Sequence, residues 1–207
     1  MKPPARRSLR GLYAITDGPR PDLLGVCEAA LEGGAAMLQY RDKSTDRARR
    51  LREAQALQAL CMRCDVPLIV NDDVELAHAI GAAGVHLGEH DGDFAAARAR
   101  LGTGAIIGVS CYDSLARARQ FAAAGADYLA FGAFFPSPTK PAARRAGASL
   151  LTDAATFRIP RVAIGGITSD NARTLIDAGA DVVAVITAVF GARDVRAAAR
   201  RLSDLFP

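Results

Sequence analysis

The amino-acid sequence predicts an α/β protein, a single (β/α)8 TIM barrel, and three observations lead to this fold class. Apolar runs of strand length alternate with stretches of helical pattern eight times along the 207 residues. The apolar runs are continuous, as in parallel strands that are buried on both faces. A short glycine-containing segment also recurs where several helices are expected to end. Eight such units close into a barrel, and the chain length requires short connecting loops.

The first half of the chain contains four strand–helix units. Each expected strand is an apolar run of four to six residues, and each expected helix mixes apolar with charged residues. In order, we expect a strand at 11–16, a helix at 23–31, a strand at 36–40, a helix at 46–64, a strand at 67–70, a helix at 74–80, a strand at 84–87 and a helix at 94–101.

The second half repeats the pattern four more times. Apolar runs again precede stretches that are rich in Ala, Leu and Arg, which suits helices packed on a sheet. We expect a strand at 105–109, a helix at 114–124, a strand at 128–133, a helix at 149–157, a strand at 161–164, a helix at 169–178, a strand at 182–186 and a helix at 194–205.

Glycine marks four of the transitions from helix to strand. The segments 33–35, 81–84, 125–127 and 179–181 each place Gly after a helical stretch and before an apolar run. Glycine readily takes the left-handed conformation that closes the last turn of a helix. Each segment therefore predicts a helix end, and the four copies indicate a repeating architecture.

The alternative fold is a doubly wound open sheet. That fold binds phosphate through a glycine-rich loop after its first strand. The residues that follow the first expected strand, Thr16-Asp17-Gly18-Pro19, do not supply such a loop. We therefore favour the barrel, as one domain over residues 1–207.

Composition and charge narrow the classes of function. Half of the residues are hydrophobic and 23% are charged, which is typical of a globular domain. The net charge of +4 comes from arginines scattered among acidic residues, so we expect no nucleic-acid partner. No apolar run reaches membrane-spanning length, and residues 1–8 have no apolar signal core. We expect a cytoplasmic protein without membrane contact; the sequence leaves its oligomeric state open.

The four cysteines are expected to be free thiols. Cys61 and Cys64 form a lone C-x-x-C pair near the end of an expected helix. No second Cys/His pair is spaced to complete a zinc site, which disfavours the alternative of a metal or redox role.

Polar residues gather where the expected strands end. In a (β/α)8 barrel the carboxyl ends of the strands form one rim, which carries the active site. Each polar end alone is ordinary loop chemistry, but the set contains the parts of a Mg²⁺–diphosphate site. The rim residues are Gln39, Arg41, Lys43, Asn71, Asp72, Asp73, His86, Glu89, His90, Asp91, Ser110, Ser137, Pro138, Thr139, Lys140, Gly165, Gly166, Ile186 and Thr187.

Asp72 and Asp91 are the candidate Mg²⁺ ligands. They follow neighbouring strands, and Mg²⁺ takes one or two carboxylates together with substrate phosphates and water. The alternative for both is a helix N-cap, a common role for Asp after a strand, although Asp73 suits a cap better than Asp72. We expect a hydrogen-bonding role for His86, at the end of its strand, and a structural role for His78, within a helix.

Two anion sites are expected on the rim. Arg41, Lys43 and Lys140 can neutralise a diphosphate. Gly165-Gly166 and Ile186-Thr187 follow the last two strands, which is the usual phosphate-binding corner of these barrels. The alternatives are solvated loop charges and a tight turn. Two anion sites suggest two phosphorylated substrates, and loss of diphosphate needs charge stabilisation rather than a protein nucleophile.

Seven segments, in order and spacing, carry a resemblance to a known family. They are 12–17 (LYAITD), 39–43 (QYRDK), 70–72 (VND), 84–88 (GVHLG), 108–110 (GVS), 132–140 (GAFFPSPTK) and 163–167 (AIGGI). Over nearly its whole length the sequence resembles the thiamine-phosphate synthase (thiamine-phosphate diphosphorylase) family.

The resemblance implies a transferase of thiamine biosynthesis that acts on two small phosphorylated molecules. It would join 4-amino-2-methyl-5-(diphosphooxymethyl)pyrimidine to 4-methyl-5-(2-phosphooxyethyl)thiazole, giving thiamine phosphate and diphosphate. The family reaction requires Mg²⁺, one ion per active site. The C–O bond breaks first, and the thiazole nitrogen captures the resulting pyrimidine carbocation.

By motif position, the resemblance also assigns the site residues. Those implied to hold the pyrimidine diphosphate are Gln39, Tyr40, Arg41, Asp42, Lys43, Asn71, Ser110 and Lys140. Within that set, the catalytic residues are Arg41, Ser110 and Lys140. Those implied to hold the thiazole phosphate are Ser137, Pro138, Thr139, Gly166, Ile186 and Thr187. The metal ligands are Asp72 and Asp91.

Three positions depart from the family pattern. Ser137 stands where Thr is frequent and Thr187 where Ser is usual, and both keep a hydroxyl group. Glu89 replaces a frequent Gln, which adds negative charge beside the expected metal ligand and could alter metal affinity or simply face solvent.

Two rival functions share part of this pattern. A thiazole tautomerase has the same barrel but needs a catalytic His and no diphosphate site; here the diphosphate set is complete and no His follows position 90. A non-catalytic sensor of a phosphorylated precursor is the second rival. The presence of Asp72, Asp91 and Lys140 argues against it.

Overall fold

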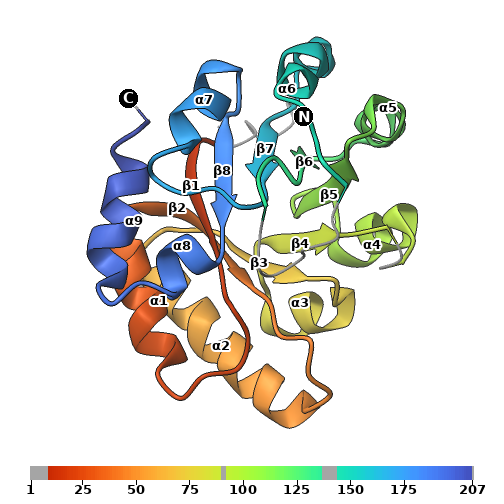
Figure 1. Ribbon diagram of the computed structural model, residues 1–207. Helices are drawn as coiled ribbons and strands as arrows, with labels where there is room; N and C mark the ends of the chain where they lie inside the picture. Colours follow the sequence, from red (N-terminus) through yellow and green to blue (C-terminus); the bar gives the residue numbers. More distant parts are fainter. Residues whose placement is uncertain (1–8, 90–91, 137–143, 207) are drawn as a thin grey trace.

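Eight parallel strands form the centre of the molecule. The computed structural model describes residues 9–89, 92–136 and 144–206. The strands close into a barrel in chain order, with β8 pairing in parallel with β1 (Figure 1). They are β1 Gly11–Ile15, β2 Ala35–Tyr40, β3 Leu68–Asn71, β4 Gly84–Leu87, β5 Ile106–Tyr112, β6 Tyr128–Phe131, β7 Arg161–Ile164 and β8 Val182–Val185. The predicted (β/α)8 barrel is confirmed.

Helices surround the barrel and connect consecutive strands (Figure 1). They are α1 Leu23–Glu32, α2 Arg47–Arg63, α3 Val74–Ile80, α4 Phe94–Leu101, α5 Leu115–Ala124, α6 Ser149–Asp153 with the 3-10 helix η1 Ala154–Phe157, α7 Ala172–Asp177, α8 Thr187–Phe190 and α9 Val195–Ser203. The short helix α8 lies outside the predicted elements, because four residues are too few to show helical periodicity.

Several element boundaries differ from prediction, and those of β6 and α7 do so for visible reasons. β6 ends at Phe131 because Ala133 pairs with the segment 144–146 instead of with a strand: its N–H donates to the Arg144 carbonyl at 3.0 Å, and its own carbonyl accepts from Ala146 at 2.9 Å. α7 begins only at Ala172 because the preceding residues form a turn, in which the Asn171 side chain accepts the Thr168 N–H at 2.9 Å.

The helix ends follow the predicted chemistry. Asp73 caps α3 by accepting the Leu76 N–H at 2.9 Å, as expected. Asp93 caps α4, accepting the Ala95 N–H at 2.9 Å. A glycine with a positive φ angle follows each of the four glycine-marked helices: Gly34 (94°), Gly81 (65°), Gly125 (90°) and Gly179 (105°). The left-handed turns predicted from glycine are therefore present.

Two apolar clusters stabilise the barrel. The larger one lies between the strands and the surrounding helices, and the smaller one fills the barrel interior. Within the interior, Met37, Ile69 and Val182 are almost completely buried near the amino-terminal half of the strands. These side chains fill that half of the interior, and the pocket described below lies toward the carboxyl ends of the strands.

Two further observations concern membranes and thiols. Within the described residues, no helix has the length and apolar character needed to cross a membrane. The cysteines are free thiols; Cys61 is buried, which raises its pKa to about 12, whereas Cys64 is exposed.

Candidate active site

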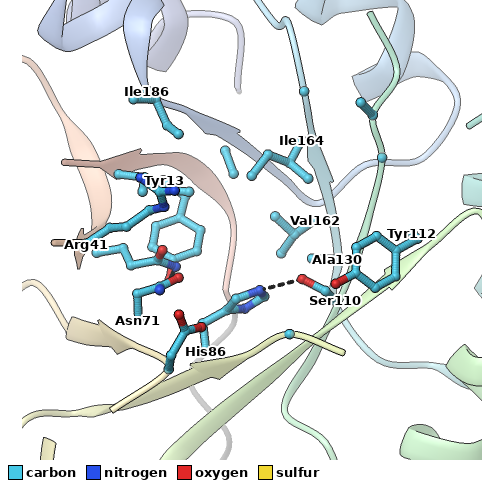
Figure 2. Close-up of a pocket in the computed structure, with 18 of the residues that line it drawn as sticks. Tyr13, Arg41, Asn71, His86, Ser110, Tyr112, Ala130, Val162, Ile164 and Ile186 are labelled. Carbon is cyan, nitrogen blue, oxygen red and sulfur yellow. Dashed lines mark hydrogen bonds between the residues drawn. The ribbon is translucent and has the colours of Figure 1, made fainter. Parts of the chain in front are cut away.

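A cavity of about 370 Å³ opens at the carboxyl ends of the strands (Figure 2). Every strand, or the loop after it, contributes to its wall, which is the arrangement expected of a (β/α)8 active site. The lining residues are Tyr13, Ile15, Gln39, Arg41, Lys43, Asn71, Asp72, His86, Gly88, Ser110, Tyr112, Ala130, Gly132, Ala133, Arg144, Val162, Ile164, Gly165, Ala184 and Ile186.

The structure brings many of the predicted rim residues together in this one pocket. They come from segments far apart in sequence and meet because parallel strands end on the same side of a barrel. Figure 2 shows Arg41, Asn71, Ser110 and Ile186 around the same cavity. The predicted rim residues that line it are Gln39, Arg41, Lys43, Asn71, Asp72, His86, Ser110, Gly165 and Ile186.

Tyr40 and Asp42 do not line the cavity, and their assignment to the pyrimidine diphosphate stays a prediction. The Tyr40 hydroxyl donates to Glu53 of α2 at 2.7 Å, and Asp42 accepts from Arg49 of the same helix at 2.8 Å. Alternate residues of an extended segment face opposite sides, so the neighbours Gln39 and Arg41 point inward while these two point toward α2.

Gly166 and Thr187 adjoin the pocket without lining it. Gly165 lines the cavity in place of Gly166. A Cβ on Gly166 would lie 2.3 Å from the Pro136 carbonyl oxygen, so the backbone there is closely packed. Thr187 is exposed and begins α8, directly after the lining residue Ile186. Gly165 is therefore the pocket-facing glycine at the corner after β7 and β8, and the phosphate-binding role of this corner stays a prediction.

The remaining predicted site residues lie outside the described part of the chain. They are Asp91, Ser137, Pro138, Thr139 and Lys140. Their assignments stay predictions.

Asp72 is presented to the pocket by an unusual backbone conformation. Its φ angle is +63°, and its N–H donates to the His86 carbonyl at 2.9 Å. Asp is one of the few side chains that tolerate this left-handed region. The carboxylate forms an ion pair with Lys43. Because Asp73 caps α3, the alternative of Asp72 as the helix cap is wrong, and its carboxylate is left on the pocket wall.

The described residues contain no cluster of three or more His, Cys, Asp or Glu side chains that could hold a metal by themselves. The carboxylate of Asp72 lies beside the cavity.

Beneath the rim, the prediction missed a buried hydrogen-bond network. Gln39 Nε2 donates to the Tyr13 hydroxyl at 2.7 Å, and the Tyr13 and Tyr128 hydroxyls lie 3.0 Å apart. His86 Nδ1 lies 2.9 Å from the Tyr128 hydroxyl, and His86 Nε2 lies 2.9 Å from Ser110 Oγ (Figure 2). We call these five residues the barrel network. The hydrogen-bonding role predicted for His86 is confirmed.

Tyr13 and Tyr128 lie within strands, away from the polar strand ends from which the site was predicted. The informative signal was a Tyr in the middle of an apolar strand, since a buried hydroxyl needs a partner. Burial raises the pKa of both phenols well above the ordinary value. Both hydroxyls therefore stay protonated at physiological pH.

Apolar side chains form the opposite wall. Ile15, Val162, Ile164 and Ala184 face the cavity from β1, β7 and β8. A wall of this kind suits a flat ring, while the cations and amides on the other side suit attached anionic groups. The pocket can therefore bind a ring-containing phosphorylated compound and keep water away from the ring.

Comparisons with known proteins agree with this geometry. A protein-family model described as thiamine monophosphate synthase matches residues 12–189. A thiamine-phosphate synthase of Chromobacterium violaceum is 56% identical over 200 residues, which cover 96% of this chain and 97% of the relative. One of Thioalkalivibrio sulfidiphilus is 56% identical over 202 residues, 96% of each protein.

The chain belongs to the thiamine monophosphate synthase family. A solved structure titled thiamine phosphate pyrophosphorylase, from Pyrococcus furiosus, superposes with a TM-score of 0.86 at 38% identity, covering 97% of this chain and 96% of that one. As a member of the family, the protein is an enzyme, a transferase of thiamine biosynthesis.

One departure from the thiamine monophosphate synthase pattern has a structural partner. Glu89 pairs with Arg144, whose Nη2 lies 3.4 Å from its carboxylate, so its extra charge is balanced locally. The Arg144 guanidinium also lies 5.3 Å from the centre of the Tyr112 ring, and both residues line the pocket. Arg144 therefore joins the end of the β6–α6 connection to the β4 and β5 side of the rim.

Proposed function

We propose that this enzyme condenses 4-amino-2-methyl-5-(diphosphooxymethyl)pyrimidine with 4-methyl-5-(2-phosphooxyethyl)thiazole to give thiamine phosphate and diphosphate. The observation that carries the proposal is the meeting of Arg41, Lys43, Asn71 and Asp72 beside an apolar wall in one cavity. The first group suits a diphosphate, and the wall suits the attached ring.

The diphosphate is held at the side formed by the ends of β2 and β3. Arg41 supplies a planar fork for two phosphate oxygens, and Lys43 supplies a point charge. Asp72 and Asp91 would hold one Mg²⁺, which when bound neutralises the charge that develops on the leaving diphosphate. The Lys43 ammonium, paired with Asp72 here, is placed to turn to a phosphate oxygen. Lys140 is expected to complete this set.

The ring of the pyrimidine substrate is held by polar groups on one side and apolar ones on the other. Gln39 and Ser110 line the cavity next to His86 and can hydrogen-bond the ring nitrogens and the amino group. Ile15, Val162 and Ala184 contact the faces of the ring. The substrate is thereby oriented with its reactive methylene carbon away from bulk water.

The reaction then needs no nucleophile from the protein. The C–O bond to the diphosphate breaks, the electron pair leaves with diphosphate, and the pyrimidine carbocation that remains is captured by the thiazole nitrogen. Arg41 and Lys43 stabilise the leaving group, and the enclosed cavity limits attack by water. Positioning the two rings in contact supplies the rest of the rate enhancement.

The thiazole phosphate is held at the corner after β7 and β8. Gly165 and Ile186 line this corner. Backbone N–H groups near glycine can approach a phosphate closely. The resemblance adds Ser137, Pro138, Thr139, Gly166 and Thr187 to this group, and the latter two adjoin the corner in the structure.

The decisive experiment is a product assay. Purified protein is incubated with both substrates, with Mg²⁺ or with excess chelator, and thiamine phosphate and diphosphate are quantified. We expect equal amounts of the two products, formed only with Mg²⁺ and only when both substrates are present. Absence of thiamine phosphate under every condition would overturn the proposal. Full activity with chelator would overturn its Mg²⁺ component alone.

A further inference from the structure

The barrel network joins two separate parts of the polar pocket wall through the protein interior. Its ends, Gln39 and Ser110, both line the cavity, and its middle members Tyr13 and Tyr128 are almost completely buried. Consecutive members are separated by 2.7 to 3.0 Å, which is normal for hydrogen bonds. A change in hydrogen-bond direction at one end can therefore alter the hydrogen bonds at the other end, because the network is continuous.

Each hydroxyl in the network has only one proton to donate. Burial raises the pKa of Tyr13 and Tyr128, so both phenols remain neutral. A neutral hydroxyl donates one hydrogen bond, and it accepts through its lone pairs. A hydroxyl that accepts at one link can therefore give its single proton to the next member.

The amide of Gln39 sets the direction at one end. Its Nε2 donates to the Tyr13 hydroxyl, which lies 3.0 Å from the Tyr128 hydroxyl, and either phenol of that pair can be the donor. If Tyr13 gives its proton to Tyr128, the proton of Tyr128 goes to His86 Nδ1, which lies 2.9 Å away. A neutral imidazole that accepts at Nδ1 carries its proton on Nε2, and that N–H donates to Ser110 Oγ. The hydroxyl proton of Ser110 is then free to face the cavity.

We propose that the barrel network is a directed hydrogen-bond relay, in which Tyr128 is a positioning residue that holds His86 in one tautomer and so makes Ser110 a hydrogen-bond donor to the ligand. The ligand atom opposite Ser110 is then an acceptor, such as a ring nitrogen of an aminopyrimidine. This last step rests on the proposed function, whereas the direction of the relay does not.

Tyr128 is held rigidly enough for this role. Its ring is stacked on His86 with an interplanar angle of 13° and meets Tyr13 edge-on, at 86°. The neighbouring Gly108 leaves the space for it, because a Cβ there would lie 1.8 Å from the Tyr128 ring. The phenol thus has one available position, and its hydroxyl reaches both Tyr13 and His86.

The imidazole tautomer of His86 tests the relay directly. Long-range ¹H–¹⁵N NMR spectra of the ¹⁵N-labelled, ligand-free protein at neutral pH distinguish protonated from unprotonated ring nitrogens, and the His86 signals are those absent from His86→Gln. We expect a single tautomer with the proton on Nε2. A proton on Nδ1 would mean that His86 donates to Tyr128, and it would overturn the proposal.

Two matched phenol variants test the role of Tyr128. In Tyr128→Phe the donor to Nδ1 is lost, so we expect the Nδ1–H tautomer to appear in the His86 spectrum. Tyr40→Phe removes another buried hydroxyl, on the outer side of β2, and should leave the His86 spectrum unchanged. An unaltered His86 spectrum in Tyr128→Phe would contradict the positioning role. If that variant does not fold, the wild-type tautomer decides.

A kinetic comparison tests the consequence for Ser110. His86→Gln keeps an N–H near the Nε2 position, whereas the shorter His86→Asn does not reach Ser110. We expect Tyr128→Phe and His86→Asn to lower kcat/KM for the pyrimidine diphosphate about 2- to 10-fold, the loss of one hydrogen bond, and His86→Gln to lower it less. Equal losses in the two His86 variants would contradict the consequence. An inactive wild type would contradict the proposed function and leave the tautomer result standing.

Discussion

Asp72 lies at the end of β3, where a left-handed backbone and an ion pair with Lys43 direct its carboxylate to the pocket. We predict that Asp72→Asn lowers Mg²⁺-dependent turnover by about 100-fold, the scale on which a charged group at a developing charge acts. Asn also tolerates a positive φ, so the fold should persist. Steady-state kinetics against Mg²⁺ concentration measure the effect, and thermal unfolding followed by circular dichroism checks the fold.

The neighbouring residue provides the matched control for Asp72. Asp73→Asn removes the same charge one position away, but Asn remains a good N-cap for α3. We expect nearly normal turnover from this variant. Wild-type turnover in Asp72→Asn, or equal losses in both variants, would remove Asp72 from the metal site.

At the scale of single residues, the sequence predicted which residue types gather at the pocket better than it predicted the direction in which each side chain points. Residue types such as Arg41 and Asp72 predicted a diphosphate site, and the structure brings both residues to one cavity. Tyr40 and Asp42 share a motif with them but face α2, because side chains alternate along an extended segment. The motif boundaries did not say where the strand ended and hence which side chains faced the pocket.

At Gly108 in strand β5, the absence of a side chain makes room for a neighbouring aromatic ring. Gly108 leaves room for the Tyr128 ring of β6, and a Cβ there would lie 1.8 Å from one ring atom and 2.2 Å from the next. We predict that Gly108→Ala destabilises the protein by about 1–3 kcal/mol, because the ring is held between His86 and Tyr13 and has nowhere to move. Urea unfolding at equilibrium measures the change.

Gly104, just before β5, is the control for this prediction. A Cβ there would meet no atom within 4 Å. Gly104→Ala should therefore change the free energy of unfolding by about 0.5 kcal/mol or less. Equal stability of the two variants would contradict the prediction, because it would mean that a side chain fits at Gly108 despite the nearby Tyr128 ring.

Element boundaries show where sequence patterns lose information. The bounds of β4, β7, α3 and α4 match the prediction, since polar caps or glycines flank continuous apolar runs. β6 is shorter than predicted because Ala133 pairs with the segment 144–146, a contact between parts of the chain that no local pattern encodes.

The reactivity of the four cysteine thiols depends on whether the whole molecule is folded. Cys61 and Cys64 belong to one C-x-x-C motif, but only Cys64 is exposed; burial raises the pKa of both Cys61 and Cys111 to about 12. At pH 8 such thiols are almost wholly protonated and unreactive. We predict that iodoacetamide modifies Cys64 rapidly in the native protein and the three buried thiols only after unfolding. Peptide mass spectrometry identifies the sites, and equally fast labelling of Cys61 would contradict the packing of α2.

The sequence by itself determined the barrel and the class of chemistry, because eight apolar strands with helices between them have few ways to bury their surfaces, and phosphate and metal ligands are limited to a few residue types. Tertiary structure alone decided which of those residues share a cavity. It placed Gln39, Asp72 and Ser110 on one wall, turned Tyr40 toward α2, and connected Tyr13 to Tyr128 across 115 positions. Such contacts depend on strand register and barrel closure, which arise only when all eight strands are paired.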